Sequence, residues 1–345
     1  MPGAVVLVAR HGVIAAERAF GAKDRSPDEP MTLDTLFDLE SVTKVMTAAT
    51  VLALADDGKL ALTDPVAKWL PAFAAAGKDH VTIDDLLIHS SGLPGDVESG
   101  PTDPADAIWQ RMFESKLEYP TRSRVGYSDL GYRTLGRIIE TATKEPLDRV
   151  MRERVFARLD LHDTVYTPPA SLRSRIAGTG PDTARGHALR GELADDRDFA
   201  LGGVVGCDGV FATAHDLAVF SQMVLSGGGH VVSPANAALM STNQTPWVDS
   251  ASTDANWASS FFAGPKTAGW ELVTPHAYGG ALSSRAFCKA GVAGTFVCVD
   301  PSTELIAIYL TNLGKPSFDE KGLADWYDAI APDRFFALVA SAARP

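Results

Sequence analysis

The stretch LFDLESVTKVMTAATVLALADDGKL, residues 36–60, is the part of the sequence from which the fold is most readily predicted. Its apolar residues recur at intervals of three and four, a spacing typical of a helix. These apolar positions are 42, 45, 46, 49, 52 and 53. Gly58 is a natural residue at which such a helix ends. We therefore predict a helix over residues 41–57, with Ser41 in its first turn.

Ser41 and Lys44 are three residues apart, so in a helix they share one face and the lysine amine reaches the serine hydroxyl. A serine hydroxyl is a weak nucleophile that needs a base. A lysine serves as that base if burial or a neighbouring cation depresses its pKa. The alternative is a helix cap beside a solvated lysine. Lys44 is the only charged residue between Ser41 and Ala55, which favours the chemical role.

The rest of the sequence places β-rich segments at both ends of the chain and helical patterns between them. Residues 4–21 form two β-rich runs around a short turn, which predicts a hairpin. Thr82 and Thr213 precede helical patterns and are expected to cap them. Short β-rich runs follow in the last quarter, and a helical pattern closes the chain. The simplest fold is one α/β domain built from both termini, with a helical domain inserted between them.

Composition and charge exclude several classes of partner. The 345 residues carry a formal net charge of −12 and no basic run, so we expect no nucleic-acid partner and no anionic membrane surface. No apolar run approaches the roughly 18 to 20 residues that span a bilayer. The start, MPGAVVLVARHG, lacks a cationic leader and a small-residue cleavage site. We expect a cytoplasmic protein, unless a leader precedes this chain.

The three cysteines, Cys207, Cys288 and Cys298, include no Cys-x-x-Cys pair and no metal-ligand spacing. We therefore expect small buried thiols and no metal site. Cys288 adjoins Lys289 in a predicted strand. Because adjacent strand residues point to opposite faces, Cys288 is expected to face away from Lys289.

Two further stretches have residues suited to chemistry. Tyr127-Ser128-Asp129 lies in a predicted turn before a helical pattern, and a tyrosine hydroxyl between two lysines loses its proton more readily. The alternative is a surface turn in which Ser128 or Asp129 caps the helix. Lys289-Ala290-Gly291 lies in a β-rich run, where the glycine allows a substrate to approach the backbone. The alternative is an ordinary strand with one exposed lysine.

Together these stretches resemble the signature of the serine β-lactamase and penicillin-binding-protein superfamily, and within it the class C β-lactamase-like branch of esterases, D,D-peptidases and transacylases. That signature is Ser-x-x-Lys, then Ser/Tyr-x-Asn, then Lys-Thr-Gly or a variant. The segments LALTDPVAKWLP and VTIDDLLIHSSGLP also resemble that branch, and the resemblance covers nearly the whole chain. It implies an α/β (α+β) fold with an antiparallel sheet flanked by helices. It also implies a sheet domain of residues 1–60 plus 255–345, a helical domain of residues 61–254, and an active site between them.

The resemblance also implies a role for each motif residue. Ser41 is the expected nucleophile, Lys44 accepts its proton or holds the network, and Tyr127 is the partner base and acid. Lys289 positions Tyr127 and helps to bind any substrate carboxylate. The backbone N–H groups of Ser41 and Val292 form the expected oxyanion hole. No cofactor or metal is implied.

This sequence departs from the family signature at two expected substrate-binding positions. Asp129 replaces an asparagine, and an aspartate accepts hydrogen bonds but cannot donate an amide N–H. Ala290 replaces a threonine, so a hydroxyl is missing beside Gly291. These differences weaken the case for β-lactam or peptidoglycan substrates and fit an ester or another acyl donor better.

We therefore expect a serine acyl-enzyme catalyst, an esterase or amidase, acting on a small-molecule acyl substrate. One alternative is a transacylase of specialised metabolism that passes the acyl group to an amine or alcohol. Another is a binding protein without catalytic activity on the same fold. The sequence leaves the acyl donor, the acceptor and the oligomeric state open. His89 and His215 lie in or at the start of helical patterns and are expected to be structural.

Overall fold

A computed structural model gives the fold, and it describes residues 2–24, 29–100, 102–249, 261–274, 278–316 and 320–343. Its centre is a six-stranded sheet with the order β2-β1-β11-β10-β9-β8, in which every neighbouring pair is antiparallel. The strands are β1 (Gly3–Arg10), β2 (Val13–Gly21), β8 (Glu271–Leu272), β9 (Phe287–Gly291), β10 (Thr295–Asp300) and β11 (Leu305–Thr311). This confirms the predicted N-terminal hairpin and the antiparallel sheet.

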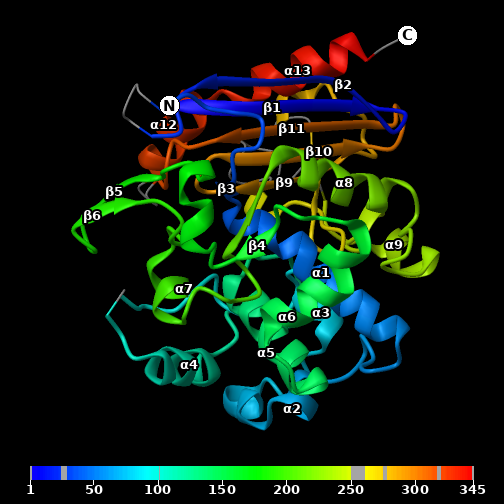
Figure 1. Cartoon of the computed structure of the whole chain (residues 1–345). Helices are drawn as coiled ribbons and strands as arrows, with labels where there is room; N and C mark the ends of the chain where they lie inside the picture. Colours follow the sequence, from blue (N-terminus) through cyan, green and yellow to red (C-terminus); the bar gives the residue numbers. More distant parts are fainter. Residues whose placement is uncertain are drawn as a thin grey trace.

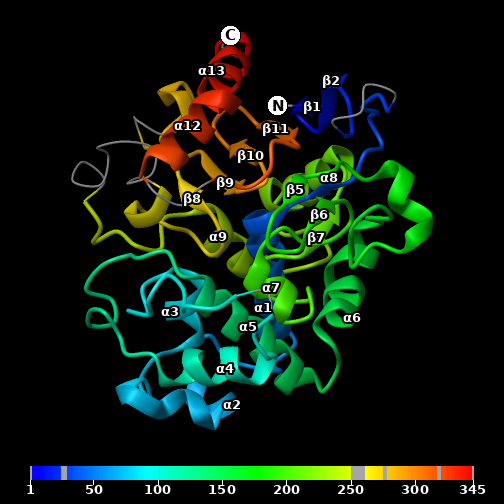
Figure 2. The ribbon, with the colours of Figure 1, turned by 90° about the vertical axis from the view of Figure 1, so that its left-hand side faces the viewer.

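The sheet joins the two ends of the chain, because β1 lies between its hairpin partner β2 and the last strand, β11 (Figure 1). Side chains alternate between two apolar layers, as the period of two in a strand requires. Val5 and Leu7 of β1 belong to the layer that also contains α1 (Thr43–Asp56) and α8 (Ala214–Leu225). Phe296 and Tyr309 belong to the opposite layer, beneath α12 (Glu320–Ile330) and α13 (Pro332–Ala342). Figure 2 shows the sheet between these two helical layers.

A second part of the molecule is mostly helical and lies below the sheet in Figure 1. Its helices are α2 (Val66–Trp69), η2 (Pro71–Gly77), α3 (Ile83–Leu87), α4 (Ala105–Glu114), α5 (Asp129–Thr143), α6 (Leu147–Met151), η3 (Arg152–Phe156) and η4 (Ala157–Leu159). The remaining elements are short: β3 (Phe37–Asp38), β4 (Val165–Tyr166), η5 (Ala170–Arg175), β5 (Gly180–Asp182), β6 (His187–Leu189), α7 (Asp196–Ala200), β7 (Val210–Ala212), α9 (Pro234–Ser241) and η6 (Tyr278–Gly280). The last of these, η6, packs against α13. The domain boundaries stay a prediction, and α8, from the range 61–254, packs on β1 and β11.

The caps expected from the sequence explain where several helices begin. The Thr82 hydroxyl accepts from the backbone N–H of Asp85, whose carboxylate accepts from Thr82 in return, which is a capping box. Thr213 caps α8 in the same way through the N–H of Asp216. Both predicted caps are confirmed.

The predicted helix over residues 41–57 is present but begins differently. A 3₁₀ turn, η1 (Glu40–Val42), contains Ser41, and the α-helix α1 begins at Thr43. Residues 43–54 of α1 are all buried, so this helix crosses the core and has no solvated face. That burial explains why Lys44 is the only charged residue in this part of the helix.

The expectation for two of the cysteines was wrong. Cys288 of β9 and Cys298 of β10 are direct cross-strand partners and form a disulfide, while Cys207 is a buried free thiol. The two strands are joined by a short hairpin turn, and this register brings the two side chains together. Both belong to the apolar layer beneath α12 and α13, whereas the neighbouring Lys289 lies on the other face of the strand.

Among the described residues, no helix is both long enough and apolar enough to cross a lipid bilayer.

Candidate active site

Ser41 and Lys44 are brought together at the start of the central helix. The Lys44 ammonium donates a hydrogen bond to the Ser41 hydroxyl, with 2.8 Å between Nζ and Oγ. Glu40, just before Ser41, has φ 48°, a left-handed conformation that costs a residue with a side chain about 1 kcal/mol. This bend takes the chain from β3 directly into η1 and places Ser41 at the wall of a cleft. The predicted contact between the serine and the lysine is therefore present.

Lys44 is held by carboxylates as well as by the serine. Its Nζ lies 2.6 Å from Oδ1 of Asp129 and 3.8 Å from Oδ1 of Asp208, and it donates to the Cys207 carbonyl at 3.1 Å. Burial alone lowers the pKa of Lys44, but the carboxylates overcome this effect and hold that pKa well above the ordinary lysine value. A lysine that acts directly as the base requires a depressed pKa, whereas in the structure Lys44 is an ammonium near neutral pH.

Three donor atoms around this ammonium, from Asp129, Cys207 and Asp208, lie within 4.8 Å of one another, a spacing that suits a metal ion. The Lys44 ammonium contacts both carboxylates of the group. A metal ion among the same oxygens would be repelled by that positive charge, so the group is better explained as the binding site of the lysine.

Tyr127 lies between the two lysines of the motifs, as expected. The Lys44 and Lys289 ammonium nitrogens are 5.2 Å and 4.8 Å from the centre of its ring. Burial nevertheless raises the pKa of Tyr127 well above its usual value, and only part of this rise is offset by Lys44. The tyrosine is therefore a neutral phenol at neutral pH. Among the described residues, no group forms a hydrogen bond with its buried hydroxyl.

His89 packs against the ring of Tyr127. Its ring stacks on the Tyr127 ring with 4.5 Å between centres, and its Nδ1 accepts from the backbone N–H of Ser128. Burial and the nearby lysines hold the pKa of His89 well below its usual range, so the imidazole is neutral. Ser128 caps α5 through the N–H of Gly131, which is the structural role that the sequence left open. His215 is exposed on α8, away from this cleft.

Lys289 is paired with a carboxylate that the sequence argument missed. Its ammonium donates to Oε1 of Glu271 at 2.5 Å, and both side chains are buried. Glu271 in β8 is the cross-strand partner of Cys288, which places it one residue from Lys289. A charged residue inside the β-rich run GWELVT was the available signal, because a buried carboxylate needs a partner.

A third buried lysine, Lys266, was also missed. Its ammonium donates to the backbone carbonyls of Phe261 and Gly264, at 2.8 Å and 3.0 Å. The intervening Phe262 carbonyl accepts from the Tyr127 N–H at 3.0 Å. Burial lowers the pKa of Lys266 to about 7. Lys266 thus fixes the segment that packs against Tyr127.

Gly291 allows the end of β9 to meet the serine loop. A Cβ at this position would overlap the Leu39 carbonyl and the Thr295 hydroxyl, which itself donates to Leu39 at 3.0 Å. The glycine was predicted to allow close approach by a substrate, whereas in the structure the protein's own backbone makes the close approach. Ala290, Gly291 and Val292 line the same cleft as Ser41. The oxyanion hole formed by Ser41 and Val292 stays a prediction.

The cleft has a volume of about 310 Å³ and lies between the sheet and the helical part. One wall is apolar and consists of Phe261, Phe262, Leu323 and Trp326. The charged residues of the lining are acidic apart from one arginine, and comprise Glu40, Asp96, Asp129, Asp195, Asp208 and Arg197. Arg197 is itself paired with Asp96 at 2.9 Å. This lining favours a ligand with an apolar body and no negative charge.

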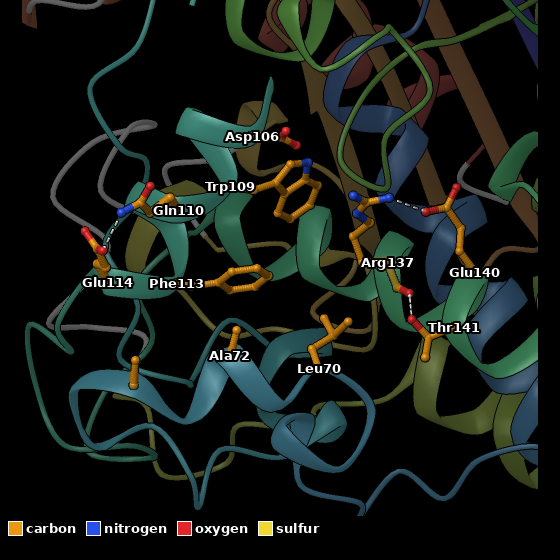
Figure 3. Close-up of a pocket in the computed structure, with 11 residues that line it drawn as sticks. Leu70, Ala72, Asp106, Trp109, Gln110, Phe113, Glu114, Arg137, Glu140 and Thr141 are labelled. Atoms are coloured by element: carbon orange, nitrogen blue, oxygen red, sulfur yellow. Dashed lines mark hydrogen bonds and ion pairs between the residues drawn. The ribbon is translucent and has the colours of Figure 1, made fainter. Parts of the chain in front are cut away.

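A larger hollow of about 800 Å³ lies elsewhere, among η2, α4 and α5 (Figure 3). Trp109 and Phe113 point into it from α4, and the Arg137 guanidinium lies 4.8 Å from the Trp109 ring. None of the motif residues lines it. The smaller cleft, which contains Ser41, Tyr127 and Asp129, is therefore the candidate active site.

Comparisons with known proteins agree with this geometry. A family model described as Beta-lactamase matches residues 1–331. A relative from Escherichia coli K12, named as a D-alanyl-D-alanine carboxypeptidase, is 29% identical over 348 residues, which cover 90% of this chain and 78% of the relative. Two solved structures are similar in fold. EstCE1, a hydrolase with promiscuous acyltransferase activity, has a TM-score of 0.76 and 23% identity over 97% of this chain and 94% of its own. A penicillin-binding protein homologue from Caulobacter crescentus has a TM-score of 0.75 and 24% identity, and the match covers 99% of this chain and 92% of the homologue.

Proposed function

Because this chain belongs to the beta-lactamase family and is a serine hydrolase, we propose that it cleaves uncharged esters through an acyl intermediate on Ser41. In this mechanism the Ser41 oxygen attacks the ester carbonyl and the alcohol leaves. Water then releases the acyl group. No cofactor is needed for either step.

The observation that carries this proposal is the hydrogen bond of 2.8 Å between Lys44 and Ser41 at the wall of the cleft. A serine that only caps a helix does not need a buried lysine on its hydroxyl. Tyr127 supports the same assignment, because it lines the cleft and no described residue forms a hydrogen bond with its hydroxyl. The proton of that hydroxyl can therefore be donated to a leaving alcohol.

The charges around the cleft support an uncharged acyl donor. Lys289, the lysine expected to bind a substrate carboxylate, is paired with Glu271, and Lys44 is paired with Asp129. Ala290 offers no hydroxyl. A substrate carboxylate would therefore meet no free cation from the motif lysines. The name of the Escherichia coli relative describes a carboxypeptidase, whose substrate ends in a carboxylate, so we infer a different substrate class for this chain.

A second candidate function is transfer of the acyl group to an alcohol or amine in place of water. The apolar wall formed by Phe261, Phe262 and Trp326 suits the body of such an acceptor. The promiscuous acyltransferase activity in the description of EstCE1 gives a precedent on this fold. Localisation in the cytoplasm stays a proposal as well, and it would give access to small metabolites as donors.

The test is intact-protein mass after brief exposure to 4-nitrophenyl butyrate, for the wild type, Ser41→Ala and a control, Ser341→Ala, from the exposed end of α13. We expect a butyryl adduct on the wild type and the control but none on Ser41→Ala. The carboxylated analogue, mono-4-nitrophenyl succinate, should acylate the wild type more slowly. Faster acylation by the succinate would overturn the proposed substrate class, and an adduct on Ser41→Ala would overturn the nucleophile.

A second measurement separates the two functions. The butyryl adduct is followed in buffer and in buffer with added butylamine or butanol. If the acceptor removes the adduct much faster than buffer does, transfer is the function; if the rates are equal, hydrolysis is.

A further inference from the structure

We propose that Asp129 accepts, through Lys44, the proton that leaves Ser41 during acylation. The inference rests on the proposed acyl-enzyme chemistry and concerns how the base is generated. It gives Asp129, one of the two residues at which this chain departs from the family signature, a role in proton transfer, beyond substrate contact.

The geometry provides a continuous path for the proton. Lys44 Nζ is 2.8 Å from Ser41 Oγ and 2.6 Å from Asp129 Oδ1, so one nitrogen contacts both the donor and the acceptor. Lys44 is fully buried, and its own proton therefore has no direct route to bulk water. Asp129 is about a quarter exposed and lines the cleft, so it exchanges protons with solvent.

The starting charge state makes such an acceptor necessary. Lys44 has a pKa well above the ordinary lysine value, because its neighbouring carboxylates outweigh the effect of burial. An ammonium has no lone pair and cannot take a proton from a serine. Lys44 must first give up one of its own protons, and the carboxylate at 2.6 Å is the base closest to it.

The other groups around Asp129 and Lys44 are poorer acceptors. Asp208 lies 3.8 Å from Lys44, beyond hydrogen-bond distance, so it does not take a proton from that ammonium directly. Tyr127 is a neutral phenol that cannot accept a proton as a carboxylate does. Three further described groups near this pair are engaged in ion pairs of their own: Arg197 is paired with Asp96, and Lys289 is paired with Glu271. Cys207 is a buried thiol whose pKa is raised by burial.

The proposed step balances in protons and charge. As the Ser41 oxygen attacks the carbonyl, its proton passes to Lys44 and a Lys44 proton passes to the Asp129 carboxylate. Lys44 remains an ammonium, Asp129 becomes a neutral acid, and the negative charge moves to the tetrahedral intermediate. When the intermediate collapses, the leaving alcohol takes a proton from Lys44. Asp129 then gives its proton back to Lys44, so Lys44 is again an ammonium and Asp129 again a carboxylate. An asparagine at this position has no site for that proton.

The experiment compares pre-steady-state acylation by 4-nitrophenyl butyrate in the wild type and Asp129→Asn, from about pH 4 to pH 10, a range that spans ordinary carboxyl and lysine pKa values. If Asp129 accepts the proton, the wild-type acylation rate falls on acidification and shows no limb at alkaline pH. In Asp129→Asn the acid limb moves to higher pH. Below that limb the rate changes about tenfold per pH unit, because Lys44 must lose its proton to solvent before it can act as a base.

The result that would contradict this proposal is a shift of the pH limb in the opposite direction. If Lys44 acts alone, the wild-type limb already lies at alkaline pH, and Asp129→Asn moves it to lower pH by removing a carboxylate that stabilises the ammonium. That shift would overturn the inference while leaving the nucleophile intact. Asp129→Glu, which retains a carboxylate, should keep the limb in the carboxyl range, and Asp106→Asn, on the distant helix α4, should match the wild type. Failure of the wild type to form any adduct would instead overturn the proposed function.

Discussion

The ammonium of Lys289 lies 2.5 Å from the carboxylate of Glu271, and both side chains are buried. The ion pair connects neighbouring strands of the sheet directly beneath Tyr127, whose ring centre is 4.8 Å from Lys289. Burial lowers the pKa of Lys289, and Glu271 counteracts this effect. The pair therefore keeps a positive charge beside the tyrosine that burial alone would disfavour.

Removing Glu271 should destabilise the protein strongly. Glu271→Ala leaves the Lys289 ammonium buried without a partner, and breaking such a pair costs roughly 3 to 5 kcal/mol of unfolding free energy. Urea unfolding measures this loss. The double variant Glu271→Met with Lys289→Met should be more stable than Glu271→Ala, because no charge remains buried. As a control, Glu145→Ala removes the exposed partner of Arg149 and should cost less than about 1 kcal/mol. Equal losses in Glu271→Ala and Glu145→Ala would contradict this account.

Gly291→Ala should reduce both acylation and stability. The added methyl overlaps the Leu39 carbonyl and the Thr295 hydroxyl, so β9 and the loop before Ser41 must move apart. We expect a loss of about 1 to 3 kcal/mol in unfolding free energy, which is typical of overpacking, together with slower formation of the butyryl adduct. The matched control is Gly100→Ala, where a methyl group meets no neighbour. If Gly291→Ala acylates at the wild-type rate, the close approach of these segments does not shape the site.

The disulfide can be tested by counting thiols. In denaturant without a reductant, iodoacetamide should modify one cysteine, Cys207, and with a reductant all three. Three adducts without a reductant would show that Cys288 and Cys298 are free thiols. Because the crosslink closes a short loop, replacing both residues by serine should lower the unfolding free energy by roughly 2 to 4 kcal/mol.

Asp38 should make the protein less stable as pH rises from about 4 to about 6. Burial raises the pKa of Asp38 from the ordinary value of 3.8 to about 6, although hydrogen bonds from the N–H groups of Ala194 and Glu40 oppose the rise. Between these values the folded state holds a proton that the unfolded state has lost. The stabilisation is therefore complete below pH 3.8 and is lost as pH rises through 6.

The shift corresponds to roughly 3 kcal/mol across this pH range. Asp38→Asn cannot ionise, so the difference in unfolding free energy between it and the wild type should change in favour of the variant as pH rises. Urea unfolding at several pH values measures the difference, in which the contributions of all other carboxyl groups largely cancel. A difference that is constant with pH would show that Asp38 titrates normally.

The sequence predicted the parts of the site that depend on local spacing. Ser41 and Lys44 are one turn apart whichever type of helix begins there. Their contact was therefore predicted correctly although the first turn is 3₁₀ and not α-helical. The N-terminal hairpin and the caps at Thr82 and Thr213 are equally local. The charge states were not predictable in the same way, because the pKa of Lys44 depends on carboxylates from α5 and from the loop before β7.

The parts that the sequence argument missed depend on the register between strands. Glu271 meets Lys289 because β8 lies beside β9 in the sheet, which brings the two residues within reach across neighbouring strands. The same reasoning applies to the disulfide, since Cys288 and Cys298 are equally distant from Ala293, the middle of a tight hairpin. A hairpin turn centred on VAG was the signal for that pairing.

The position of β1 between β2 and β11 also governs how the chain reaches its folded state during synthesis. Ala4 pairs with Thr311, so the sheet cannot close until the roughly three hundred residues between these two have been synthesised. Until then the apolar side chains of β1 and an unpaired strand edge stay available to other chains, which is the condition under which nascent proteins aggregate. Such distant pairings also slow folding, because the chain loses the entropy of a long loop before the contacts that stabilise the closed loop can form. Synthesis of this protein should therefore benefit from chaperones that cover β1 until β11 is available, and chains truncated before β11 should accumulate as insoluble, inactive material.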